Sequence, residues 1–357
     1  MPERSRMPGI LRIAGISMQS GGPKMDRRTF SILGATALAG TRFGALTTKA
    51  HAADNTIRLA LQPAPLLGFY VKEKKLLEKR GFKPEWNVFP FSPPILEAMA
   101  AGSVDIALLG VLPVISSATK DAGVWYFYDE LANAAGLMVQ ADSAIKGPAD
   151  LKGKKIAFPG KASQLYGQLL IYLSGSGVTE NDIDLVRANA TDMGTLFQRK
   201  AVDGMLAWPP FTTEPVRSGA GRTLFTADDL LKLKAGHWLN SGWGVRADYA
   251  KSHEDAVLAV VESLHEATRV LREKPEEVYG VFAQATGYDV DAIRFLVKEN
   301  YEFYYDPKDT TPSAANLQQL YDVMAKYDIV KSEKPIKPVL EALVHPEFVE
   351  KVLAKAK

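Results

Sequence analysis

The feature that most constrains this chain is an alternation of short β-rich runs with helical stretches, which begins at Asn55 and later starts again. In the first series, strands are expected at 56–61, 83–89, 104–109 and 124–128, and helices at 66–79, 95–101 and 112–120. An alternation of this kind predicts α/β architecture, in which helices cover mainly parallel sheets.

The second series follows a strand expected at 136–140 and opens on the polar segment 150–155. Its strands are expected at 156–158, 184–188 and 204–207, and its helices at 164–174 and 193–199. Two successive series of similar size predict two lobes rather than one large sheet.

The chain after the second series is expected to return to the first lobe. Residues 238–247 look extended enough for that return, and 254–272 has apolar residues at the three- and four-residue steps of a helix. The predicted domains are 53–135 for the first part of lobe 1, 136–240 for lobe 2, and 241–357 for the completion of lobe 1 with extra C-terminal helices.

The N-terminal part has the pattern of an export signal, expected at 25–52. A basic start, an apolar stretch at 30–40 and a small-residue site at 50–52 follow one another in the order typical of such signals. We expect cleavage between Ala52 and Ala53, and release of the mature chain into the periplasm.

The pair Arg27-Arg28 resembles a twin-arginine signal, although Asp26 is not the usual preceding residue, so both bacterial export routes stay open. Residues 1–24 are interpreted as an upstream extension, because Met25 is the better start for a signal.

Composition excludes several classes of function. Cysteine is absent from the 357 residues, which excludes disulfides, thiolate metal sites, cysteine nucleophiles and a cysteine-linked lipid anchor. The first 52 residues hold eight Lys and Arg against two acids, and removing that excess of six positive charges turns the formal net charge of +2 into −4. An acidic body gives no reason to expect nucleic acid as a partner.

The sequence also lacks the common signatures of catalysis. Its five histidines show no metal-ligand spacing. No Gly-x-Ser-x-Gly elbow and no phosphate-binding P-loop is present. We therefore expect no cofactor and no metal, and we expect a binding protein rather than an enzyme.

Two loops that follow predicted strands have the features of helix starts. In Phe91-Ser92-Pro93-Pro94, Ser92 is expected to cap a helix and Pro93 to occupy its first turn. In the second loop, Lys161 precedes a capping hydroxyl at Ser163 and the first helical residue, Gln164. Helix N-termini attract anions, and ligands of open α/β sheets lie beyond the carboxyl ends of the strands. If the lobes face each other, these two helix starts converge on one cleft.

Three segments, 91–106, 150–157 and 202–210, resemble in order and spacing the sulfonate-, taurine- and nitrate-binding components of bacterial ABC importers. The resemblance covers about Asn55 to Tyr249. It implies a type II periplasmic-binding-protein fold, with two α/β lobes joined by a hinge of two crossovers that closes on a small ligand. It also implies a monomer whose partners are a membrane permease and its ATPase.

The hinge is expected at 129–139 and 238–248. The loop positions and the resemblance together give a set of candidate ligand-binding residues: Gln62, Ser92, Pro93, Val111, Leu112, Lys161, Ser163, Gln164, Trp208 and Trp238.

The expected ligand is a small organic anion, either a sulfonate or an aromatic or aliphatic carboxylate. Aromatic residues lie in or beside the proposed loops, no arginine is evident there, and this combination favours an organic body over a bare ion such as nitrate. Pro209 stands where the resembling proteins often have aspartate, which counts against a zwitterion such as taurine.

Three alternatives stay open. The first is a periplasmic ligand-binding sensor, which would share the fold and the export signal. The second is a binding protein whose ligand is a pyrimidine resembling a thiamine precursor. A periplasmic enzyme is the third alternative. The enzymes that share this fold, pyrimidine synthases of thiamine biosynthesis and a desulfinase, depend on cysteine, and this chain has none.

Overall fold

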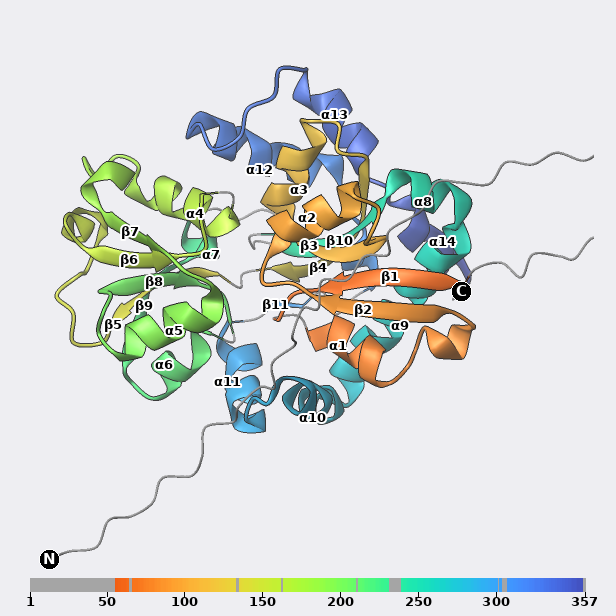
Figure 1. Cartoon of the computed structure of the whole chain (residues 1–357), viewed down its shortest axis with the longest axis horizontal. Helices are drawn as coiled ribbons and strands as arrows, with labels where there is room; N and C mark the ends of the chain where they lie inside the picture. Colours follow the sequence, from red (N-terminus) through yellow and green to blue (C-terminus); the bar gives the residue numbers. More distant parts are fainter. Residues whose placement is uncertain are drawn as a thin grey trace, which may run out of the picture. The chain divides into compact units, whose positions relative to one another are not determined.

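The computed structural model shows two α/β sheets with helices packed on them (Figure 1). The residues that the structure describes are 55–63, 66–132, 135–161, 163–209, 211–230, 239–300, 302–303 and 307–355. The predicted export signal and upstream extension, 1–52, lie outside these residues.

The first sheet has six strands in the order β11-β4-β10-β3-β1-β2, and we call it, with its helices, lobe 1. Its strands are β1 (Thr56–Leu61), β2 (Lys83–Val88), β3 (Ile106–Gly110), β4 (Val124–Ala132), β10 (Leu239–Arg246) and β11 (Glu302–Phe303). Its helices are α1 (Leu66–Glu73), η1 (Glu78–Arg80), α2 (Ser92–Ala100), α3 (Val111–Ala118), α8 (Ala247–Ser252), α9 (Glu254–Glu273), α10 (Pro275–Thr286), α11 (Val290–Asn300), η4 (Pro307–Thr310), α12 (Ala314–Lys326), α13 (Ile336–Leu343) and α14 (Glu347–Lys355).

The second sheet has five strands in the order β7-β6-β8-β5-β9, and we call it, with its helices, lobe 2. Its strands are β5 (Gly136–Gln140), β6 (Lys155–Phe158), β7 (Asp184–Arg187), β8 (Gly204–Ala207) and β9 (Gly221–Thr226). Its helices are η2 (Pro148–Leu151), α4 (Gln164–Leu173), η3 (Glu180–Asp182), α5 (Ala190–Gln198), α6 (Thr213–Arg217) and α7 (Ala227–Leu230).

The predicted order of strands and helices is confirmed, and the strands at 56–61, 136–140 and 204–207 have the predicted bounds. The helix expected at 66–79 is wrong in its second half. Helix α1 ends at Glu73, because the chain turns at Lys75, whose φ of 55° is left-handed and does not continue a helix.

Most strands of each sheet run in one direction, as predicted, but both sheets are mixed and not purely parallel. Strands β1, β2 and β3 are parallel, as are β6, β7 and β8, whereas β10 and β5 run antiparallel to their neighbours. The reason is topological: each of these two strands enters its sheet from the other lobe, at the edge where the parallel strands end. Strands β5 and β10 therefore run from the carboxyl ends of the parallel strands back toward their amino ends.

The core of lobe 1 lies on both faces of its sheet (Figure 1). Helices α1, α9, α10 and α14 bury one apolar cluster with Trp243, and α2, α3, α12 and α13 bury the other with Tyr126. Lobe 2 has two smaller clusters in the same arrangement, around Phe225 and Phe197. Burial on both faces explains why the central strands are almost continuously apolar.

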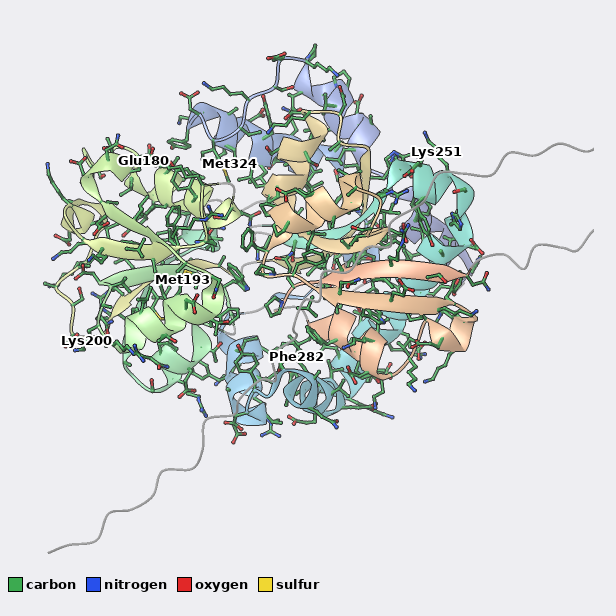
Figure 2. The ribbon with its side chains drawn as sticks, in the orientation of Figure 1. Glu180, Met193, Lys200, Lys251, Phe282 and Met324 are labelled. Carbon is green, nitrogen blue, oxygen red and sulfur yellow. The ribbon has the colours of Figure 1, made fainter. Side chains whose placement is uncertain are left out.

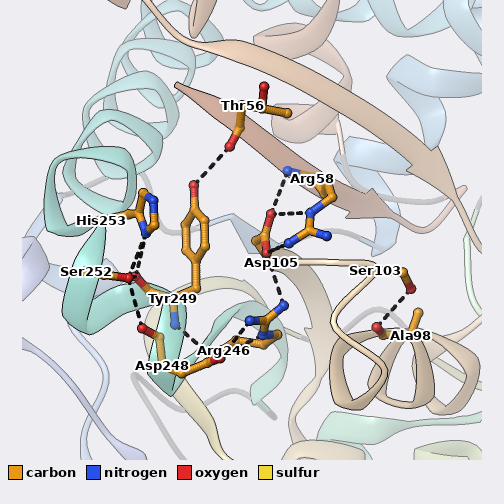
Figure 3. Close-up of polar contacts among 10 residues, drawn as sticks. All are labelled: Thr56, Arg58, Ala98, Ser103, Asp105, Arg246, Asp248, Tyr249, Ser252 and His253. Carbon is orange, nitrogen blue, oxygen red and sulfur yellow. Dashed lines mark hydrogen bonds and ion pairs between the residues drawn. The ribbon is translucent and has the colours of Figure 1, made fainter. Parts of the chain in front are cut away.

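The edge of the lobe 1 sheet where β1 begins is held together by one buried carboxylate (Figure 3). Asp105, 1% exposed, accepts hydrogen bonds at Oδ2 from the amide of Arg58 at 3.0 Å and its Nε at 2.8 Å. Its Oδ1 accepts from Arg58 Nη2 at 2.6 Å and lies 3.4 Å from Nη1 of Arg246. A single side chain thus links β1, the start of β3 and the end of β10.

We predict that Asp105→Ala destabilises the protein by about 3 kcal/mol, because it leaves two guanidinium groups without their buried partner. Urea unfolding of residues 53–357, followed by circular dichroism, measures the loss. Asp248→Ala is the matched control: this carboxylate also pairs with Arg246 but is 72% exposed, so its removal should cost below about 1 kcal/mol. Equal losses in the two variants would contradict this account.

A second buried carboxyl group lies near the end of β4. Glu130 is 1% exposed, and Trp243 donates its indole N–H to Oε2. Burial raises the pKa of Glu130 to about 8, against the opposing effect of the indole hydrogen bond. The folded protein therefore holds Glu130 as a neutral acid at neutral pH.

This pKa predicts how stability depends on pH. Between the ordinary value of 4.5 and about 8, the folded state binds one more proton than the unfolded chain, so stability falls as pH rises through this window. Relative to Glu130→Gln, the wild type should lose about 1.4 kcal/mol per pH unit there. Urea unfolding at several pH values tests this, and parallel curves for the two proteins would refute the proposed titration.

Candidate functional site

The loops after β2 and β6, one from each lobe, line one cavity of about 660 Å³. Of the candidate residues, Pro93, Lys161 and Ser163 lie on its wall. The complete lining is Phe91, Pro93, Pro94, Glu97, Phe158, Pro159, Gly160, Lys161, Ser163 and Arg187. The convergence of these two loops, expected from the sequence, is therefore present in the structure.

The lobe 2 wall has the predicted helix cap. Ser163 precedes α4, and its Oγ accepts a hydrogen bond from the amide of Tyr166 at 3.3 Å while donating to the carbonyl of Gly160 at 2.7 Å. Nζ of Lys161 lies 3.0 Å from Oε2 of Glu180. Burial alone would raise the pKa of Glu180, but hydrogen bonds from Tyr166 and Lys161 lower it below its ordinary value. The positive charge of Lys161 is thus already matched by a carboxylate.

The lobe 1 wall differs from the prediction. Ser92 is the first residue of α2 and not its cap, since Phe91 holds the capping position with an extended backbone. The Oγ of Ser92 instead accepts hydrogen bonds from the amide of Gly110 at 2.8 Å and from Nε2 of Gln62 at 3.2 Å. Pro93 and Pro94 lack amide hydrogens, so the first turn of α2 has fewer free donors than expected.

A second group of candidate residues forms a hydrogen-bonded link between the lobes. Gln164, buried in the first turn of α4, accepts a hydrogen bond at Oε1 from the amide of Leu112 at 3.3 Å. Its Nε2 donates to Oδ1 of Asn240, on β10. Val111, the first residue of α3, is fully buried. The loops expected to face a ligand are here held against one another.

Next to this link, α4 packs closely on lobe 1 at Gly167. A Cβ added at this glycine would lie 3.1 Å from Sδ of Met324, 3.3 Å from Leu112 and 3.4 Å from Ile329. Figure 2 shows Met324 on α12, where lobe 1 meets α4. A residue without a side chain is therefore what allows the two lobes this contact.

The aromatic candidates are less directly connected to the cavity. Trp208 is half-buried, packs against both clusters of lobe 2, and lies edge-on to Phe211 with ring centroids 5.9 Å apart. Tyr70 and Tyr166 belong to buried clusters. Trp238 lies outside the described residues. A ligand contact by either tryptophan remains a prediction.

Arg187, the last residue of β7, lines the cavity and was not among the predicted site residues. The strand predicted at 184–188 includes it one residue before its end, so its position near the carboxyl edge of the sheet was the available signal. Asn240 was not predicted either, because only the return of the chain on β10 brings it to Gln164.

Within the described part of the chain, no three His, Cys, Asp or Glu side chains are grouped as metal ligands. Among the same residues, no helix is both long and apolar enough to cross a membrane.

Comparison with known proteins identifies the family. The family model described as NMT1/THI5 like matches residues 92–278, which is more than half of the chain. The chain belongs to the NMT1/THI5-like family. The match begins at Ser92, next to Pro93 of the cavity wall, and includes the whole of lobe 2.

Curated relatives of this NMT1/THI5-like chain are binding proteins. A putative aliphatic sulfonates-binding protein of Escherichia coli K12 is 28% identical over 68% of this chain and 76% of its own length. A taurine-binding periplasmic protein of the same strain is 25% identical over 77% of this chain and 85% of its own length. The crystal structure of the periplasmic aliphatic sulphonate binding protein from Escherichia coli is 26% identical, covers 81% of this chain and 98% of that one, and has a TM-score of 0.65. The fold is therefore that of periplasmic binding proteins.

Proposed function

We propose that this protein is the ligand-capturing component of an ABC importer, which takes up a small organic anion between its two lobes and delivers it to a membrane permease. The observation that carries the proposal is the cavity of about 660 Å³ whose walls come from both lobes. The sulfonate- and taurine-binding relatives support the class of ligand.

The mechanism follows from a ligand that touches both walls. Such a ligand binds the closed arrangement of the lobes more tightly than the open one, so it shifts the equilibrium toward closure by the difference in affinity. The permease and its ATPase then recognise the closed form. The hinge in this proposal lies where the chain passes between the lobes, between β4 and β5 and again before β10. The second predicted hinge segment, 238–248, consists largely of β10, which belongs to the lobe 1 sheet and would move with lobe 1.

The proposal places the mature chain in the periplasm, after removal of the signal at 25–52. A sensor that shares the same binding step is the alternative role. The neighbouring genes separate the two roles, because permease and ATPase genes beside this gene would favour transport. The sulfonate- and taurine-binding relatives support capture of a ligand rather than catalysis.

The first test is thermal melting of residues 53–357 in Tris buffer against sulfonates, aromatic and aliphatic carboxylates, nitrate, amino acids and pyrimidines. A ligand present at 100 times its dissociation constant adds about 2.7 kcal/mol to stability, which raises the melting temperature by several degrees. We expect a shift with organic monoanions. A shift with a pyrimidine alone would replace the proposed ligand class. If none of the acids shifts the melting temperature, the proposed function is overturned.

The contact at Gly167 tests the closure mechanism. Gly167→Ala should weaken binding of the best acid of the panel about fivefold, because its Cβ presses on Met324 and Leu112 and disfavours closure. Gly194→Ala is the matched control, since this helical glycine of α5 has open space around its Cβ position. Titration calorimetry measures both affinities, and equal affinities in the two variants would contradict closure at this contact.

A further inference from the structure

Arg187 differs from the other cation of the cavity wall. It is exposed, it ends β7, and no carboxylate of the described residues pairs with its guanidinium group. Lys161, by contrast, is bound to Glu180. The cavity therefore presents one positive group whose hydrogen-bond donors are available.

The backbone beneath Arg187 is shaped to hold its side chain. Gly160 has a φ of +127°, a conformation that other residues rarely adopt. A Cβ at Gly160 would lie 3.4 Å from Nε of Arg187 and 3.9 Å from Cδ and Cζ. The guanidinium group therefore lies over a glycine surface. Phe158 of β6 pairs with Arg187 of β7 in the parallel sheet, and this pairing places Arg187 beside the loop that contains Gly160.

The rest of the cavity wall has two different chemical characters. Most of it is apolar, formed by Phe91, Pro93, Pro94, Phe158 and Pro159. The lobe 1 side also carries Glu97, an exposed carboxylate on α2 that has no ion pair with any described residue. One available cation and one available anion thus line a mainly apolar cavity, and they come from opposite lobes.

We propose that Arg187 binds the oxyanion head of the ligand, a carboxylate or a sulfonate, while the apolar walls contact its body and Glu97 rejects a second negative charge. This inference rests on the proposed function and narrows its ligand class to monoanions with an apolar body. The planar fork of arginine matches two oxygens of such a head at once. A second anionic group near Glu97 would meet like charge.

The test is titration calorimetry in Tris buffer with two matched pairs of probes: benzoate with terephthalate, and benzenesulfonate with 1,4-benzenedisulfonate. The wild type should bind the monoanion of a pair more tightly than its dianion, and the better pair identifies the head group. Arg187→Gln should weaken monoanion binding by about 10-fold to 100-fold, since a charge-assisted hydrogen-bonded pair is lost. Arg187→Lys should weaken it less, because charge remains without the fork.

Two controls make the result specific. Arg199→Gln removes an exposed arginine of lobe 2 that does not line the cavity, and it should change affinity less than twofold. Glu97→Gln should reduce the ratio of monoanion affinity to dianion affinity, and it should leave the affinity for the monoanion at least as high as in the wild type. Melting of each variant without ligand verifies folding.

If the wild type and Arg187→Gln bind benzoate or benzenesulfonate with equal affinity, this inference is overturned and the proposed function still stands. Weakening of binding by Arg199→Gln equal to that by Arg187→Gln would also overturn it. Absence of wild-type binding to every acid of the melting panel would overturn the proposed function and this inference together.

Discussion

The arrangement of the site depends on one topological constraint: both sheets direct the carboxyl ends of their parallel strands toward the chain crossovers. Strand β4 runs parallel to β1 and β3 and leaves lobe 1 at the edge where they end, and β5 enters lobe 2 beside the ends of β6 and β8. Each loop after a parallel strand is therefore placed near the other lobe. Convergence of the loops at Pro93 and Ser163 follows from this constraint and needs no specific attraction between them.

Much of this organisation was predictable, because strands and the cap at Ser163 depend on local sequence patterns. The role of Ser92 was not predictable from its loop, since the amide of Gly110 and the side chain of Gln62 compete for its hydroxyl and reach it only in the folded lobe. Arg187 was missed for a similar reason: its strand was predicted, but its place over Gly160 depends on sheet pairing.

The segment that most clearly carries the family resemblance has two separate roles. Its beginning, at Phe91 and Pro93, lies in the candidate site, whereas Asp105 at its end holds the opposite edge of the sheet through Arg58 and Arg246. One segment thus contributes both to the candidate site and to the stability of the lobe 1 sheet. The charges that distinguish ligands, Arg187 and Glu97, belong to the cavity wall alone.

The central claim is that one ligand is held by both lobes. A crystal structure of residues 53–357 with the tightest-binding acid tests it most directly. We predict an oxyanion within hydrogen-bond distance of Arg187 on lobe 2 and an apolar body in contact with Phe91 or Pro93 on lobe 1. A ligand seated entirely on one lobe, or outside the cavity, would contradict the account.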